Sequence, residues 1–125
     1  MRPKVDNASN NLRLAHPLTP AVFFILFALA DGQKHGYAIM QQTSKLSEGS
    51  LRIGPGTLYT TIQRLLHLAA IEEVSGSSRA TDQEARRRYY RLTASGRALL
   101  NAEIHRMKLV VHRAARMKLV PKQAG

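Results

Sequence analysis

The chain lacks cysteine and tryptophan and holds few acidic residues, and these scarcities narrow what the protein can do. Without cysteine it forms no disulfide, offers no thiolate nucleophile and supplies no thiolate ligand for zinc. The apolar run from Val22 to Ala30 is far shorter than the roughly 20 residues that a membrane-spanning helix needs. The polar N-terminal stretch lacks the apolar segment of a secretory signal. We therefore expect a cytoplasmic protein with no membrane partner.

Acidic residues are greatly outnumbered by basic ones. Lysine and arginine number 19 against 8 acidic residues, which gives a formal net charge of +11. Such an excess favours polyanionic partners, because each phosphate neutralised by Lys or Arg releases condensed counterions. The charge is also clustered, since between Arg86 and Lys118 ten basic residues are opposed by Glu103 alone. This clustering predicts nucleic-acid binding, whereas an evenly basic surface would indicate only solubility.

Patterns typical of catalysis and of metal binding are missing. The sequence shows no Ser/His/Asp arrangement and no paired-carboxylate site. His105 and His112 lie seven residues apart, on one side of a helix, but only Glu103 is close to them. We interpret both as surface histidines rather than metal ligands. The sequence therefore predicts neither an enzyme nor a cofactor or metal site.

The N-terminal part contains a polar arm and then an unusually apolar helix. We interpret residues 1–17 as a flexible arm, with a short helix around residues 11–15 as the alternative. Thr19 is the predicted cap of the first helix and Pro20 its first residue, where the missing N–H costs nothing. Because this helix is apolar on all sides, we expect it to be buried on more than one side and to meet a second subunit. Its aromatic residues are the expected contacts: Phe23, Phe24 and Phe27.

Two further helices follow, and the second of them carries the predicted DNA-reading face. A turn at residues 31–34 precedes a helix from His35 or Gly36 to about Leu46, and Pro55 opens the next helix near Gly56 or Thr57. On a helical projection of this third helix the apolar residues share one side. The residues predicted to contact DNA lie on the opposite side or its flank: Thr57, Tyr59, Thr60, Gln63 and Arg64.

These side chains suit different parts of DNA. Thr57 and Thr60 hydroxyls suit phosphates or base edges, Gln63 suits adenine, and Arg64 suits guanine or a phosphate. Tyr59 lies on the flank, so its hydroxyl either contacts a phosphate or its ring packs in the core. An ordinary solvated helix face is the alternative, and the basic hairpin that follows favours DNA.

The hairpin is predicted from residues 71–75 and 87–92, with a loop rich in serine, glycine and charge between them. Alternation along the second strand places Arg86 and Arg88 on the face opposite Arg87, so one duplex cannot contact all three. We assign Arg79 and Arg87 to the DNA backbone; a solubilising charge run is the alternative.

Thr93 is the predicted cap of a fourth helix that continues to about Leu119. Its apolar residues recur at spacings of four and three and form a seam. A helix of some 25 residues overhangs so small a domain, and the seam lacks partners within one chain, so we expect a homodimer. The seam consists of Leu100, Ile104, Met107, Val111 and Ala114.

The order of these elements is typical of a winged helix-turn-helix domain. The expected fold class is mainly α with a small β-hairpin, plus a long C-terminal dimerisation helix. The expected domain boundaries are 18–93 for the DNA-binding domain, 94–120 for the dimerisation helix and 121–125 for a tail.

Three motifs resemble the PadR family of bacterial transcriptional regulators, in the family's order and spacing: residues 35–37 (HGY), 56–59 (GTLY) and 88–96 (RYYRLTASG). The resemblance implies a homodimer whose third helix enters the major groove, whose wings touch flanking backbone, and whose last helix dimerises with help from the first. It also implies repression, relieved in many members by a small-molecule effector. The short tail resembles the compact branch of the family.

Two departures from the family pattern limit what the resemblance implies. Multidrug-sensing members rely on tryptophan, and this chain has none, so that activity is not expected. Ala69-Ala70 stands where the family usually has Gly-Leu. If that position needs a positive φ, alanine there costs roughly 1 kcal/mol.

We therefore expect a cytoplasmic, sequence-specific repressor that binds a pseudo-palindromic operator in double-stranded DNA as a homodimer. A basic RNA- or nucleoid-binding module without sequence preference is the alternative, but such a protein needs no defined reading face. A protein-binding winged helix would show an acidic or apolar third-helix face, and this helix has neither.

Overall fold

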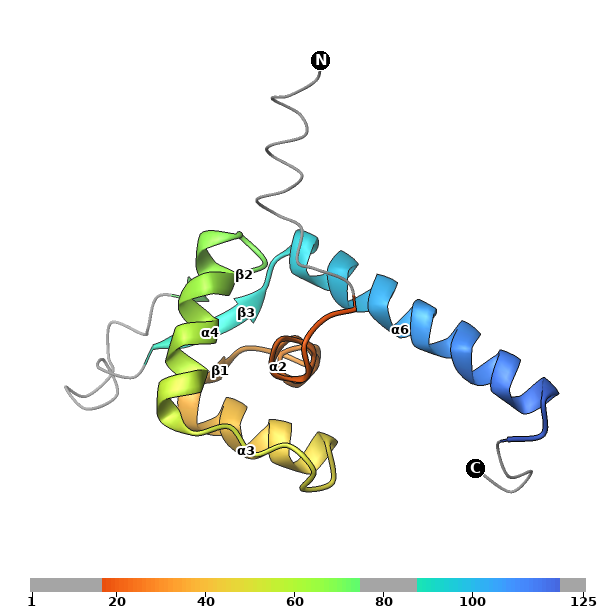
Figure 1. Ribbon diagram of the computed structural model, residues 1–125. Coiled ribbons are helices and arrows are strands. Elements are labelled where there is room, and N and C mark those ends of the chain that lie inside the picture. Colours follow the sequence, from red (N-terminus) through yellow and green to blue (C-terminus); the bar gives the residue numbers. More distant parts are fainter. Residues whose placement is uncertain (1–16, 75–87, 120–125) are drawn as a thin grey trace, which may run out of the picture.

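A computed structural model describes residues 17–74 and 88–119. The expectations for the N-terminal arm, the loop between the strands and the C-terminal tail fall almost entirely outside these residues. A small sheet packs against the helices, and one long helix extends away from them (Figure 1). The described elements are α2 (Pro20–Ala28), β1 (Lys34–His35), α3 (Gly36–Leu46), α4 (Pro55–His67), β2 (Ile71–Val74), β3 (Tyr89–Leu92) and α6 (Ala94–Arg116).

Helix α2 lies at the centre of the fold, and its start follows the predicted signals. The Thr19 side chain accepts a hydrogen bond from the Val22 N–H at 3.3 Å, and Pro20 is the first helical residue. The helix contacts α3, α4 and α6, and in Figure 1 it is seen end-on between them. These three helices of the same chain explain why α2 is apolar on all sides.

The burial of α2 corrects one expectation about the dimer. Phe23 is buried in the core of its own chain, with 8% of its surface exposed, so it is not available to a second subunit. Phe24 and Phe27 are half-buried against the same core, and the three rings contact one another.

The sheet has three strands rather than the two expected. Strand β3 is central and pairs antiparallel with both β1 and β2. Strand β1 falls where we expected the end of a turn, and Lys34 pairs with Tyr90. Two residues are too few to show a period of two, so this strand leaves no signal in the sequence pattern.

A tight junction joins the end of α4 to the start of α6. Ala69 has a φ of +61°, the conformation that glycine adopts at little cost. The Thr93 hydroxyl donates to the Ala69 carbonyl at 2.6 Å, and the Thr93 N–H donates to the Ala70 carbonyl at 3.1 Å. A Cβ on Gly96 would lie 1.9 Å from the Ala70 carbonyl oxygen, so only glycine permits this approach. We call this contact the α4–α6 junction.

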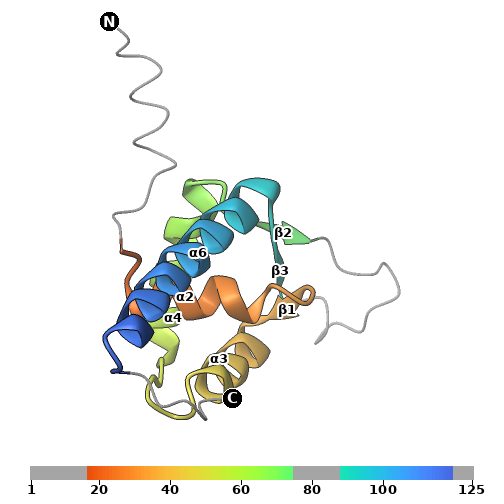
Figure 2. The same cartoon turned by 90° about the vertical axis from the view of Figure 1, so that its right-hand side faces the viewer.

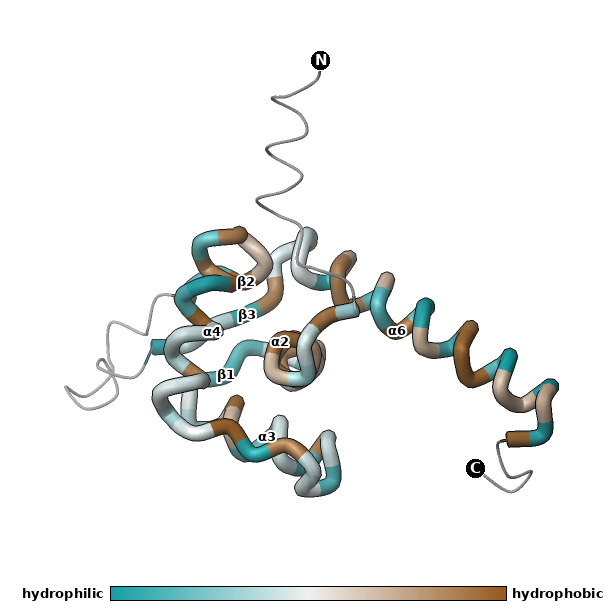
Figure 3. Tube along the Cα trace, in the orientation of Figure 1, coloured by the Kyte–Doolittle hydropathy of each residue, from teal (hydrophilic) through white to brown (hydrophobic). Residues whose placement is uncertain are grey.

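Helix α6 packs on the core with residues up to Met107. Its cap is Thr93 as predicted, and the helix ends at Arg116, three residues before the predicted end. The helix crosses α2 (Figure 2), and Leu100 is buried there. Beyond the crossing, apolar residues still recur along the helix (Figure 3) and are exposed. No helix within the described residues is long and apolar enough to cross a membrane.

Candidate nucleic-acid interface

One side of α4 anchors the helix and the other is open. Leu58, Ile62 and Leu65 are buried to 1% exposure or less. The five residues predicted to contact DNA are all exposed: Thr57, Tyr59, Thr60, Gln63 and Arg64. Tyr59 is 53% exposed, so the alternative in which its ring packs in the core is wrong. The predicted face therefore exists as a surface, and its contact with DNA stays a prediction.

Helix α4 lies close against the start of α3 because Gly36 has no side chain. A Cβ on Gly36 would lie 3.3 Å from Leu58 Cδ2 and 3.5 Å from the Tyr59 hydroxyl oxygen. The start of α3 is itself fixed by His35, whose Nδ1 accepts a hydrogen bond from the Ala38 N–H at 3.3 Å. This packing holds the Tyr59 hydroxyl beside the first turn of α3.

The arginines of the basic cluster have different environments. Arg79 and Arg87, predicted to bind the DNA backbone, lie outside the described residues. Arg91 forms an ion pair with Glu72 at 2.7 Å, and Arg88 lies 3.6 Å from Glu73. The charge cluster identified in the sequence begins at Arg86 and therefore did not include these two glutamates. They lie on β2 and contact the arginines across the sheet.

Two further polar contacts fasten α6 to the ends of α2. The Arg97 guanidinium donates to the Ala30 carbonyl at 3.1 Å, just after α2. Glu103 is buried, and its carboxylate accepts from the Leu18 N–H at 3.3 Å, just before α2. Arg106 donates to both oxygens of Glu103, and this bonding raises the pKa of Arg106. The side chains of Arg97 and Arg106 therefore bond to their own chain, and the sequence pattern did not predict these bonds.

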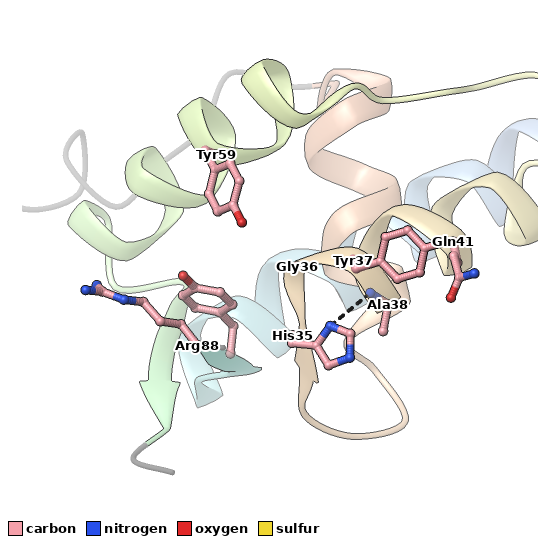
Figure 4. Close-up of a pocket in the computed structure, with 8 residues that line it drawn as sticks. His35, Gly36, Tyr37, Ala38, Gln41, Tyr59 and Arg88 are labelled. Atoms are coloured by element: carbon pink, nitrogen blue, oxygen red, sulfur yellow. Dashed lines mark hydrogen bonds between the residues drawn. The ribbon is translucent and has the colours of Figure 1, made fainter. Parts of the chain in front are cut away.

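A pocket of about 580 Å³ opens beside α4 (Figure 4). Tyr59 enters it from α4, Tyr37 and Gln41 stand on the α3 side, and Arg88 is on the side of β3. Tyr90 also lines the pocket but is 2% exposed. Burial, reinforced by the nearby Glu73 carboxylate, raises the pKa of Tyr90. The lining residues are His35, Gly36, Tyr37, Ala38, Gln41, Tyr59, Arg88 and Tyr90.

The residues of the predicted dimer seam fall into a buried group near the crossing with α2 and an exposed group beyond it. Leu100 is 2% exposed in the core of its own chain, which corrects the expectation that it lacks partners there. Met107 packs at the edge of this core and Ala114 is half-buried. Ile104 and Val111 are 39% and 54% exposed. A hollow of about 430 Å³ continues this exposed surface, lined by Arg106, Leu109, Val110, Arg113, Ala114, Met117 and Leu119.

No group of three potential ligands among His, Asp and Glu gathers to hold a metal ion within residues 17–74 and 88–119. Glu103 accepts hydrogen bonds from the Leu18 N–H and from Arg106.

Residues 25–102 match the Transcriptional regulator PadR-like family. The chain is 39% identical over 79 residues to Transcriptional regulator Rv3488 of Mycobacterium tuberculosis, covering 63% of this chain and 67% of that protein. It is also 39% identical over 87 residues to an uncharacterized 37.1 kDa protein in transposon TN4556 of Streptomyces fradiae. That match covers 70% of this chain but 23% of the transposon protein, so the chain spans under a quarter of this relative's length.

A similar fold occurs in the crystal structure of a PadR family transcription regulator from Clostridium difficile. The TM-score is 0.65 at 21% identity, with 79% of this chain and 98% of that chain covered. The predicted fold class, a winged helix-turn-helix with a long C-terminal helix, is confirmed.

Proposed function

The chain belongs to the transcriptional regulator PadR-like family, and from this membership we propose that it is a homodimeric repressor of transcription in the cytoplasm. Its operator is a pseudo-palindromic site in double-stranded DNA, and a small-molecule effector relieves repression, as the family resemblance implies. The observation that carries the proposal is the exposed polar face of α4, held outward by the buried side chains of Leu58, Ile62 and Leu65.

Each residue of this face has an assigned role in the proposed complex. Gln63 and Arg64 read base edges in the major groove, and Thr57, Tyr59 and Thr60 hold phosphates or base edges. The described residues support this because all five side chains are exposed on the same helix. Arg79 and Arg87 are proposed to grip flanking backbone.

The exposed apolar surface of α6 supports the homodimer. Ile104, Leu109, Val110 and Val111 each expose 39% or more of their surface on a helix that extends past the domain. A second copy covering them removes apolar surface from water at about 25 cal/mol per Å². With two-fold symmetry the half-sites lie roughly one helical turn of DNA apart, or a multiple of it.

Footprinting on the DNA upstream of the chain's own gene tests this proposal. We expect two protected half-sites, and binding that survives an excess of random DNA. Equal affinity for that DNA and for random duplex would contradict the repressor and favour the alternative, a basic RNA- or nucleoid-binding module without sequence preference.

A further inference from the structure

We propose that the pocket between α3, α4 and the start of β3 holds a backbone phosphate of bound DNA. The inference rests on the proposed function, because it takes operator DNA as the ligand. It adds a binding site formed by Tyr37, Arg88 and Tyr90, none of which belongs to the reading face of α4.

The lining of the pocket suits an anion that accepts hydrogen bonds. Tyr37 and Tyr59 are 62% and 53% exposed, so both rings remain open to solvent. Gln41 contributes an amide, and Arg88 a guanidinium at the rim (Figure 4). Among the described residues, none that lines the pocket carries a carboxylate. Phenol and guanidinium donors together match the acceptor oxygens of a phosphodiester.

Tyr90 adds a further hydroxyl to the lining of the pocket. Its side chain is almost entirely buried, yet it lines the pocket. A hydroxyl that lines the pocket can donate a hydrogen bond to a phosphate oxygen held there.

Arg88 is held near the pocket by a contact that a phosphate can replace. Its guanidinium lies 3.6 Å from the Glu73 carboxylate, longer than a hydrogen bond, and both side chains are exposed at 66% and 42%. Exposed ion pairs of this kind contribute little. A phosphate in the pocket offers Arg88 shorter, charge-assisted hydrogen bonds instead.

The position of the pocket favours DNA over a small molecule. Tyr59 belongs both to the pocket and to the exposed surface of α4, so the two sites share a border. In a helix-turn-helix the helix before the reading helix crosses the DNA backbone, and here that helix is α3. A duplex lying along α4 therefore brings its backbone past Tyr37 and Arg88.

Arg91 provides a matched control for Arg88. Both are exposed arginines beside or within β3, and each faces a glutamate of β2. Their odd separation along the strand places them on opposite faces of the sheet. Replacing Arg91 removes the same charge without touching the pocket.

The experiment compares Arg88→Ala, Tyr37→Phe and Arg91→Ala on the footprinted operator. We expect Arg88→Ala to bind about tenfold more weakly, and Tyr37→Phe several-fold more weakly. A phosphate contact carries no sequence information, so the loss is equal on random DNA. The slope of log affinity against log salt falls by about 1 for Arg88→Ala. Arg91→Ala stays within about twofold of the parent chain.

A second measurement locates the phosphate. Operators carrying a single neutral methylphosphonate at successive positions are bound by the parent chain and by Arg88→Ala. We expect one position in each half-site where neutralisation weakens the parent chain but has no further effect on Arg88→Ala. Thermal unfolding of each variant confirms that it is folded.

The outcomes separate the pocket from the proposed function. If the parent chain protects no operator, the proposed function fails first. The parent chain can instead protect an operator while Arg88→Ala and Tyr37→Phe bind it as well as Arg91→Ala does. That result overturns the phosphate site and leaves the proposed repressor function intact. A loss of effector response with unchanged DNA affinity in Arg88→Ala also overturns the phosphate site, in favour of a small-molecule site.

Discussion

Ala69 occupies a backbone conformation that its side chain disfavours. Its φ of +61° places it in the left-handed region, where a Cβ crowds the following carbonyl. Sequence analysis drew attention to this position because glycine usually stands there in the family, and the structure shows that the turn does require a positive φ here. The cost falls on the folded state alone, because the unfolded chain is free to avoid it.

Replacing Ala69 by glycine should therefore stabilise the protein. We expect the free energy of unfolding to rise by about 0.5–1 kcal/mol, the left-handed cost being partly offset by the greater backbone entropy of unfolded glycine. Urea unfolding measures it as a higher midpoint at an unchanged slope. Ala102→Gly, inside exposed helix α6, is the control and should destabilise by about 1 kcal/mol.

Gly96 shows the opposite requirement. An added Cβ would lie 1.9 Å from the Ala70 carbonyl oxygen, which is backbone and cannot rotate away. Gly96→Ala should therefore destabilise the chain by about 3 kcal/mol or more, because the start of α6 must shift. Gly56→Ala is the control, since nothing lies within 4 Å of its added Cβ, and thermal unfolding compares the two. Equal melting temperatures would contradict the steric argument.

At the scale of single elements, helix α4 carries the sharpest functional prediction. Gln63→Ala and Arg64→Ala should weaken operator binding more than binding to random DNA, by about 1–3 kcal/mol for a side chain with good base contacts. Competition binding with both DNAs measures the difference. Thr61, half-buried on the flank of the same helix, supplies the control as Thr61→Ser. Parallel losses on both DNAs would show that these side chains read no bases.

Local signals predicted the helices well because caps and prolines act within a few residues. Thr19, Thr93 and Pro55 mark helix starts in the structure as they do in the sequence. Alternation was less informative for the sheet, because β1 has only two residues and its identity depends on pairing with β3. Secondary structure set by distant pairing leaves little trace in a local pattern.

The pocket was invisible in the sequence for a related reason. Tyr37, Tyr59 and Arg88 lie in three separate segments, and only the packing of α3 against α4 and the sheet brings them together. The sequence did identify Tyr59 as a candidate site residue, because its helix shows a clear polar side. The engagement of Arg97 and Arg106 was likewise hidden, since a run of charges does not show which of them fold back onto the chain.

At the scale of the whole molecule, the outer half of α6 is where a second copy is expected. Ile104→Asp places a charge into the proposed interface, which is costly when buried without a partner. We expect a monomer in sedimentation and loss of operator binding, although the DNA-facing side chains are intact. His105→Asp is the control, an exposed neighbour outside the seam. A folded, dimeric and fully active Ile104→Asp chain would refute this assembly.

Leu100 is unsuitable for the test because it is part of the monomer core.

The α4–α6 junction converts a small change of angle at the start of α6 into a large displacement of its far end. Gly96 and Thr93 seat the start of α6 directly on the backbone that ends α4. From Gly96 to Arg116 the helix measures roughly 30 Å at 1.5 Å per residue. A tilt of about 10° at the junction moves the far end of that arm by roughly 5 Å, close to one helical turn. Conversely, a dimer that holds the far end of α6 in place also fixes the angle between α6 and α4. A displacement of a tenth of an ångström at that end corresponds to a fraction of a degree at the junction.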